Sequence, residues 1–285
     1  MRRLVIGCGY LGERVARAWR DAGDEVYATT RGERTEVLSN AGFRPLAVDV
    51  TAGPALRALP GVDTVLFSVG RGQLSGVTMF DIHVTGFRAV LDALPASTGR
   101  VIYVSTTGVY AHNVGEWVDE ASVTEPLHEG GRACLTAERL LRAHVHGRNG
   151  IVLRMAGLYG AGRVPRANDV MRGKSIAGSP DAYVNLIHVD DAAHAAVAVA
   201  DLPSVTSRTY VVSDGHPPTR GEYVGMVAAG MALPVPPFTG GNGRGKRVRN
   251  TRIVRELDLH LKYVSFREGL AASHPDAARR VLDPL

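Results

Sequence analysis

Short runs of consecutive apolar residues alternate, along the first two-thirds of the chain, with stretches in which apolar residues recur at helical spacing. Runs such as Leu4–Ile6 and Thr64–Phe67 lack the alternation of a strand with one solvated face, so they indicate a sheet covered on both sides. This rhythm is typical of βαβ units and a parallel sheet. Strands are predicted at residues 3–6, 25–30, 43–47, 64–68, 101–105 and 151–155.

Helices are predicted at residues 12–22, 80–94 and 133–145. After Gly157 glycine and proline become frequent, and the pattern predicts only a helix at 190–200, a strand at 209–212 and a loop at 234–245. Asn250 is expected to cap a short helix that ends at Leu257. We therefore predict a Rossmann-type, doubly wound α/β domain over residues 1–157. Residues 158–285 are expected to return to the sheet and form a small C-terminal substrate lobe.

Composition narrows the class of protein. The chain is 45% hydrophobic and 21% charged, as in an ordinary globular protein, and no apolar run approaches the roughly 20 residues of a membrane helix. Its two cysteines, Cys8 and Cys134, are too few for a disulfide framework or a metal cage. We expect a cytoplasmic protein with no membrane partner and no bound metal.

The formal charge of +5 is concentrated near the C-terminus. No aromatic residue is interleaved with this basic stretch and no nucleic-acid motif is present, so no nucleic-acid partner is expected. An anionic cofactor or substrate, or a solvated basic face, accounts for the charge equally well. The oligomeric state stays open between a monomer and a homodimer. The basic stretch consists of Arg244, Lys246, Arg247, Arg249 and Arg252.

A glycine-rich turn follows the first predicted strand and opens the first predicted helix. Gly7 permits the tight turn, Gly9 lets the backbone approach a pyrophosphate, and Gly12 lets helix and strand pack closely. The N–H groups at the start of the helix then face the phosphates. The turn predicts a dinucleotide site formed by Gly7, Gly9, Tyr10, Leu11 and Gly12.

The end of the second strand indicates which dinucleotide binds. An NAD site places a carboxylate there to accept hydrogen bonds from the ribose, and that carboxylate repels a 2′-phosphate. Here the strand ends in Thr30 and Arg31, with Arg34 close behind, and a hydroxyl beside guanidinium groups matches a phosphate. NADP(H) is therefore favoured. Glu33 keeps NAD(H) possible, and Arg31 as a mere solvent-facing loop residue is the alternative.

Further motifs follow in the order found in a known family. Asp49 and Val50 follow the third predicted strand, Ser68-Val69-Gly70 follows the fourth, and 104–110 (Val-Ser-Thr-Thr-Gly-Val-Tyr) covers the end of the fifth. Together with 153–160 and 185–191, they make the chain resemble an extended short-chain dehydrogenase/reductase of the NAD(P)-dependent epimerase/dehydratase group. The resemblance implies adenine and ribose contacts for the first two motifs. It also implies that Thr106 is the active-site hydroxyl.

The family's Tyr-x-x-x-Lys pair is absent. In that family the lysine ammonium lies one helical turn from the phenol and lowers its pKa so that it acts as a base. With Glu138 as the anchor of the comparison, the tyrosine position falls on Gly130 and the lysine position on Cys134. The chain therefore resembles the atypical members of the superfamily, and the usual proton transfer needs a substitute.

Thr106 is the first candidate for that chemistry, by hydrogen bonding to a substrate oxygen, and Tyr110 is a candidate proton donor. Their alternatives are a hydroxyl that satisfies backbone and a packed ring. Cys134 is interpreted as an inert thiol, although a helix N-terminus or Arg132 would lower its pKa. His112, His128 and Glu129 are candidate acids or bases in a loop. Substrate contacts are assigned to Arg154, Arg163 and His188, with carboxylate pairing or backbone hydrogen bonding as the alternative.

These residues predict an NADP(H)-dependent oxidoreductase or epimerase-like enzyme that acts on a small hydroxy, carbonyl or sugar-derived substrate. The alternative is a non-catalytic NADP(H)-binding sensor or regulatory protein, since a sensor needs the cofactor site but no base.

Overall fold

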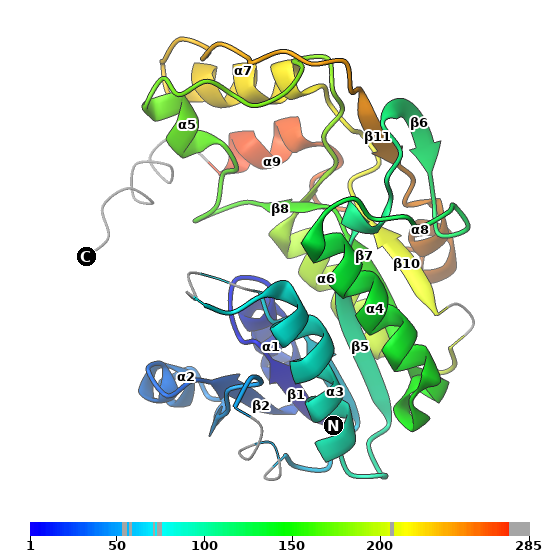
Figure 1. The fold of residues 1–285 in the computed structure, drawn as a ribbon. Helices are drawn as coiled ribbons and strands as arrows, with labels where there is room; N and C mark the ends of the chain where they lie inside the picture. Colours follow the sequence, from blue (N-terminus) through cyan, green and yellow to red (C-terminus); the bar gives the residue numbers. More distant parts are fainter. Residues whose placement is uncertain (53–55, 57–58, 71, 73–75, 206–207, 274–285) are drawn as a thin grey trace. The chain divides into compact units, whose positions relative to one another are not determined.

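The computed structural model describes residues 1–52, 56, 59–70, 72, 76–205 and 208–273. A seven-stranded sheet runs in the order β10-β7-β5-β4-β1-β2-β3, and the pairs from β5 to β3 are parallel (Figure 1). The chain order reverses between β1 and β4, which is the switch point of a doubly wound fold. The strands are β1 (Arg2–Ile6), β2 (Glu25–Thr30), β3 (Arg44–Ala47), β4 (Thr64–Phe67), β5 (Arg100–Thr106), β7 (Ile151–Met155) and β10 (Thr209–Val212).

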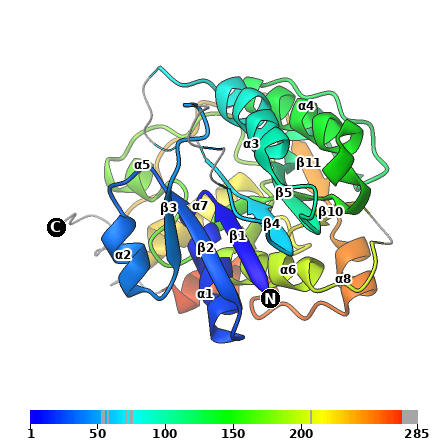
Figure 2. The ribbon, with the colours of Figure 1, turned by 90° about the horizontal axis from the view of Figure 1, so that it is seen from below.

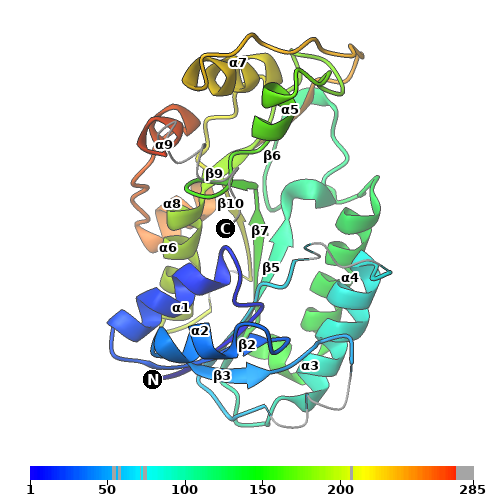
Figure 3. The same cartoon turned by 90° about the vertical axis from the view of Figure 1, so that its left-hand side faces the viewer.

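Helices cover both faces of this sheet. α1 (Gly12–Asp21) and α6 (Val189–Ala200) lie on one face, whereas α3 (Phe87–Ala93) and α4 (Glu129–Ala143) lie on the other (Figures 2 and 3). The central strands are fully buried along most of their length, as their unbroken apolar runs predict. The predicted Rossmann-type α/β fold is confirmed. A further short helix, α2 (Thr35–Asn40), precedes β3.

The chain forms two compact units, each built from three segments. The first unit comprises residues 1–109, 124–154 and 193–210, and the second comprises 110–123, 155–192 and 211–285. The change from the first unit to the second after residue 154 lies close to the expected boundary at 157. However, residues 110–123 before this boundary belong to the second unit, and residues 193–210 after it belong to the first. Within the described residues, no helix is long and apolar enough to cross a membrane.

The second unit contains two small parallel ribbons. β6 (Val114–Val118) pairs with β11 (Gly245–Val248), and β8 (Gly157–Tyr159) pairs with β9 (Leu186–His188). Its apolar core includes Tyr159, Ile176, Val224 and Phe266. Its helices are α5 (Ala167–Met171), α7 (Arg220–Gly230), α8 (Thr251–Leu257) and α9 (Phe266–Ala272).

Three local expectations need correction. α4 begins at Glu129 rather than residue 133, and includes two glycines that the sequence pattern placed outside the helix. The helix expected at 80–94 starts as a π-helical turn, Asp81–Gly86, before α3. Asn250 precedes α8 but makes no capping hydrogen bond, because its side chain donates to the carbonyl of Ser213 instead.

Candidate cofactor site and active site

The three glycines of the turn after β1 differ in the space around each of them. Gly7 has a φ of 89°, and a Cβ there would lie 2.7 Å from the backbone of Val69. A Cβ on Gly12 would clash with the carbonyl oxygen of Gly7, whereas a Cβ on Gly9 would meet nothing within 4 Å. The first and third glycines are therefore required by packing. The second leaves open backbone that fits the approach of a dinucleotide pyrophosphate.

Neighbouring strands fix the turn. The hydroxyl of Ser68 donates to the carbonyl of Gly7 over 3.0 Å, and the Gly7 N–H donates to Thr29 over 3.1 Å. Leu11 is buried at the start of α1, and the Arg14 guanidinium lies 4.5 Å from the centre of the Tyr10 ring. The turn is thus rigid before any cofactor binds. Val69 is half-buried and Gly70 is exposed beside it.

The corner after β2 carries two arginines in different roles. Thr30 accepts the N–H groups of Gly32 and Arg34 through its hydroxyl oxygen, each at 3.4 Å. Arg34 reaches back across the turn, where it donates to the Cys8 carbonyl over 2.7 Å and pairs with Glu13 at 2.6 Å. Arg31 is exposed, and its charge helps to lower the pKa of the Asp49 carboxyl, although no hydrogen bond or ion pair joins Arg31 to a described residue. Arg34 thus braces the turn, and Arg31 keeps its donors available.

Asp49 and the thiol of Cys8 have opposite electrostatic settings. The carboxylate of Asp49 accepts the hydroxyl and the N–H of Thr51 at 2.7 and 2.8 Å, and these hydrogen bonds lower its pKa. A carboxylate accepts hydrogen bonds only, so it can serve as an acceptor for an adenine amino group. Burial raises the pKa of Cys8 to about 11, so this thiol is neutral and unreactive. Val50 is buried behind Asp49.

Thr106 is the last residue of β5, and its hydroxyl group can still donate a hydrogen bond. Its oxygen accepts the N–H of Gly108 over 3.0 Å, which satisfies backbone as the alternative reading of this residue required. A hydroxyl that accepts one bond still carries its own proton, so Thr106 remains able to donate to a substrate oxygen. Tyr110 is only 2% exposed, and its ring lies edge-on to His112 at 6.4 Å. Burial of this phenol does not suit a proton donor.

The start of α4 approaches the segment after Thr106 closely. A Cβ on Gly131 would clash with the carbonyl oxygen of Gly108, whereas one on Gly130 would lie 3.6 Å from Met79. Burial raises the pKa of Cys134 to about 11, which supports its reading as an inert thiol. Gly130 and Cys134, the positions of α4 that correspond to the family's tyrosine and lysine, therefore offer neither a phenol nor an ammonium group.

A buried polar pair, which sequence reasoning did not predict, lies further along α4. The Arg154 guanidinium contacts the Glu138 carboxylate through Nε at 3.0 Å and Nη2 at 2.8 Å. Ser105 donates to the same carboxylate over 2.6 Å, and Glu138 is fully buried. Arg154 was a candidate substrate contact, but it is only 3% exposed. The alternative of carboxylate pairing is therefore the correct description of this residue.

The remaining candidates lie elsewhere. His188 is 4% exposed, between the rings of Tyr159 and Tyr263 at 5.3 and 4.0 Å, and its Nδ1 accepts the N–H of Asp190. This setting favours a packing role. Arg163 is exposed and bridges through its backbone to Gly160.

The loop candidates for acid or base form no shared centre. Glu129 is exposed and accepts the N–H of Met79 over 3.0 Å, and His128 is exposed at the N-cap of α4. Across the described part of the chain, no group of three or more metal-ligating side chains gathers.

A parallel sheet with an open glycine turn after its first strand defines a dinucleotide-binding Rossmann protein. The chain belongs to the NAD dependent epimerase/dehydratase family, whose model matches residues 3–213. Short-chain dehydrogenase/reductase family 42E member 1 of Danio rerio is 29% identical over an alignment of 195 residues, and the match covers 59% of this chain. The chain matches 50% of the length of that relative.

Solved structures extend the likeness to the whole chain. A Methylobacillus flagellatus protein that carries the family's name is 28% identical, with a TM-score of 0.80 and 98% of each chain covered. UDP-glucuronic acid 4-epimerase from Bacillus cereus, in complex with NAD, has a TM-score of 0.81 at 17% identity over 99% of this chain and 100% of the other. The predicted family is confirmed.

Proposed function

We propose that this family member uses NADP(H) as its cofactor and acts on a small hydroxy, carbonyl or sugar-derived compound. The observation that carries the proposal is the corner after β2. Thr30 and the uncommitted, exposed Arg31 stand where an NAD site carries a carboxylate. A guanidinium fork there matches a 2′-phosphate, and NADP(H), when bound, supplies a hydride acceptor or donor.

The chain's own residues position the reacting groups. The Gly9 backbone accommodates the pyrophosphate, Asp49 accepts from the adenine, and the Thr106 hydroxyl donates to a substrate oxygen. Arg163 is the exposed candidate for an anionic substrate group, and Arg154 is not retained. Nucleotide sugars belong in the substrate screen, because similar folds have been solved with UDP-glucose and UDP-glucuronic acid.

A titration of the full chain with NADPH and NADH, followed by nicotinamide fluorescence, tests the cofactor. We expect NADPH to bind more tightly, and Arg31→Asp to weaken NADPH binding roughly tenfold or more, because a charge-assisted contact is replaced by repulsion. Arg172→Asp is the matched control, since Arg172 is also an exposed arginine but lies in the second unit. Equal binding of NADH and NADPH would refute the preference.

The second candidate function is an NADP(H)-binding sensor without turnover. The buried, neutral Cys134 and the bare Gly130 favour it, because neither supplies a base. Thr106→Val separates the two functions. If the chain is an enzyme, this variant loses turnover and retains NADPH binding. If the native chain binds NADPH but turns over no carbonyl or sugar-nucleotide substrate, the sensor is favoured.

A further inference from the structure

Three arginines and two aromatic rings alternate in the second unit. The Arg247 guanidinium lies 4.8 Å from the ring centre of Trp117 and 4.9 Å from that of Tyr183. Arg249 lies 5.0 Å from the Trp117 ring, and Arg244 lies 6.0 Å from the Tyr183 ring. We call these five residues the arginine–aromatic ladder. Such cation–π contacts hold a guanidinium in place without neutralising its charge.

Backbone pairing fixes the ladder. Arg247 lies opposite Trp117 in the β6–β11 ribbon, and its Nε donates to the carbonyl of Gly115 over 2.7 Å. The N–H of Tyr183 donates to the carbonyl of Arg244 over 2.8 Å. Glu116, the carboxylate of the ribbon, accepts the N–H of Val114 over 2.9 Å and acts electrostatically on Lys246.

Among the described residues, no carboxylate pairs with Arg244, Arg247 or Arg249. Other arginines of the same unit do have such partners, as Arg252 has in Glu120 at 3.6 Å. The terminal nitrogens of Arg247 also have no acceptor in the described part of the chain. A planar fork of free N–H donors fits a carboxylate or a phosphate in bidentate fashion.

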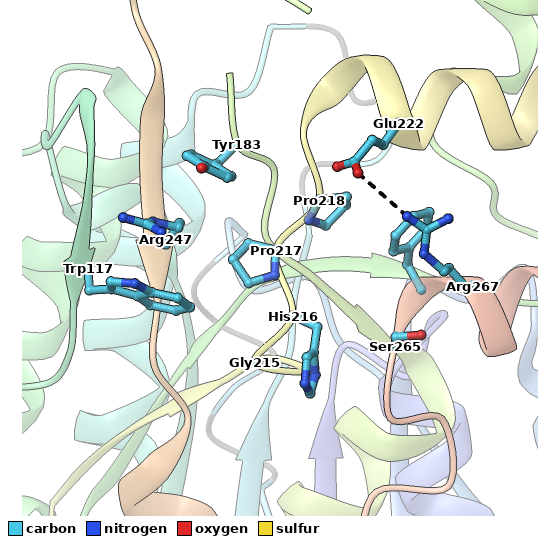
Figure 4. A pocket seen from close by; sticks show the side chains of 11 residues that line it. Trp117, Tyr183, Gly215, His216, Pro217, Pro218, Glu222, Arg247, Ser265 and Arg267 are labelled. Carbon is cyan, nitrogen blue, oxygen red and sulfur yellow. Dashed lines mark ion pairs between the residues drawn. The ribbon is translucent and has the colours of Figure 1, made fainter. Parts of the chain in front are cut away.

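Arg247 faces a cavity of about 400 Å³ (Figure 4). Trp117, Arg247 and Tyr183 form one side, and the loop of Pro217 and Pro218 contributes an apolar wall. Across the cavity lies the ion pair of Glu222 and Arg267, at 3.6 Å, with Phe266 beside it. The cavity is open to solvent along much of its rim, and it combines apolar walls with a few polar groups, as small-molecule sites do.

We propose that this cavity binds a small organic anion, with a carboxylate or phosphate on Arg247 and an apolar body against the two prolines and Phe266. A nucleic acid is disfavoured, because guanidinium groups lie over the Trp117 and Tyr183 rings on which bases would otherwise stack. The site goes beyond the proposed function, because that function uses none of the residues that line this cavity, and the glycine turn belongs to the first unit.

Titration of the full chain with phenyl phosphate, benzoate and inorganic phosphate, followed by tryptophan fluorescence, tests the proposal. Trp117 is 38% exposed and the other tryptophan, Trp19, is 1% exposed, so the signal reports on the cavity. We expect saturable binding of phenyl phosphate or benzoate, weaker binding of inorganic phosphate, and a roughly tenfold or greater loss in Arg247→Gln. Comparison of the affinities for phenyl phosphate and benzoate shows whether the site prefers a phosphate or a carboxylate.

Arg255→Gln is the matched control, since Arg255 is an exposed arginine of α8 outside the cavity. Unchanged NADPH binding in Arg247→Gln shows that the variant is folded and separates this test from that of the cofactor. Arg267→Gln, at the opposite wall, provides a second variant that should also weaken binding. The proposal is overturned if neither organic anion binds saturably, if Arg247→Gln binds as well as the native chain, or if only an oligothymidine binds.

Discussion

Arg154 and Arg247 place the same side chain in opposite settings. In the first unit, Arg154 is 3% exposed, and its Nε and Nη2 atoms both donate to the carboxylate of Glu138. In the second unit, Arg247 is half-buried between two rings, and no described carboxylate pairs with it. A guanidinium whose N–H groups donate to a carboxylate of the protein contributes to the fold. A guanidinium that is held by contacts with aromatic rings keeps N–H donors for a ligand.

Removing Glu138 is the most severe way to test this comparison. Glu138→Ala removes the buried carboxylate that contacts Nε and Nη2 of Arg154 and is expected to cost about 3–5 kcal/mol in the free energy of unfolding. Urea denaturation followed by circular dichroism measures this loss. Glu36→Ala, at an exposed position of α2, should stay within about 0.5 kcal/mol. A loss below 1 kcal/mol in Glu138→Ala would mean that the pair is not a structural element.

Asp214 sharpens the contrast, because this buried carboxyl of the second unit has no arginine or lysine partner among the described residues. Burial raises its pKa to about 7 from the ordinary 3.8. The folded state therefore holds a proton between these values that the unfolded state releases, so stability falls as pH rises from about 4 to about 7. By this shift the contribution amounts to about 2–4 kcal/mol.

Asp214→Asn should remove that fall, since the amide does not ionise and its oxygen can still accept the N–H of His216. Urea denaturation at a series of pH values measures it, with Asp181→Asn, at an exposed aspartate, as the control. An unaltered pH profile in Asp214→Asn would show that this carboxyl is not the group responsible.

Two adjacent glycines test how α4, which carries Glu138, is held in the first unit. Gly131→Ala places a methyl group against the Gly108 carbonyl and is expected to cost about 1–3 kcal/mol. Gly130→Ala meets only Met79 at 3.6 Å and should be neutral or stabilising by up to about 1 kcal/mol. Thermal unfolding of both variants provides the comparison. Equal effects would contradict the close approach seen at Gly131.

The smallest expected effect belongs to the ladder. Arg247→Gln removes ring contacts at a partly solvated site and should cost no more than about 1 kcal/mol, although we expect it to weaken anion binding roughly tenfold or more. Arg154→Gln, by contrast, should destabilise strongly and serves as the opposite reference in the same urea series. If both substitutions cost the same free energy, the two arginines do not differ in the manner described.

Much of the sheet and the glycine turn could be predicted because their causes are local. Apolar runs give β1, β4 and β7 to within a residue or two, although Arg154 interrupts the run in β7, and Gly7 and Gly12 each have a steric reason in the turn. Local pattern failed for the start of α4. The predicted helix starts at residue 133, whereas α4 includes Gly130 and Gly131, and Gly131 allows the close approach to Gly108.

Contacts between distant segments could not be predicted in this way. The charge of Arg154 within an apolar strand signals a buried partner, but nothing near it identifies Glu138 on the preceding helix. The basic C-terminal stretch showed no interleaved aromatic residues because Trp117 and Tyr183 reach it from other segments. The corner after β2 was predicted from composition, and the structure separates the roles of Arg31 and Arg34 only by their contacts.

The β6–β11 ribbon joins segments that are far apart in the chain, with the Arg247 side chain bonded to a carbonyl 132 residues earlier. During synthesis, β6 leaves the ribosome long before its partner strand exists. Until β11 has been synthesised, Trp117 and the apolar residues around it therefore remain exposed to solvent or to other chains. We expect nascent chains that end before residue 245 to lack the cavity and to aggregate more readily than the full chain. The closure of this long loop is also expected to slow refolding of the second unit.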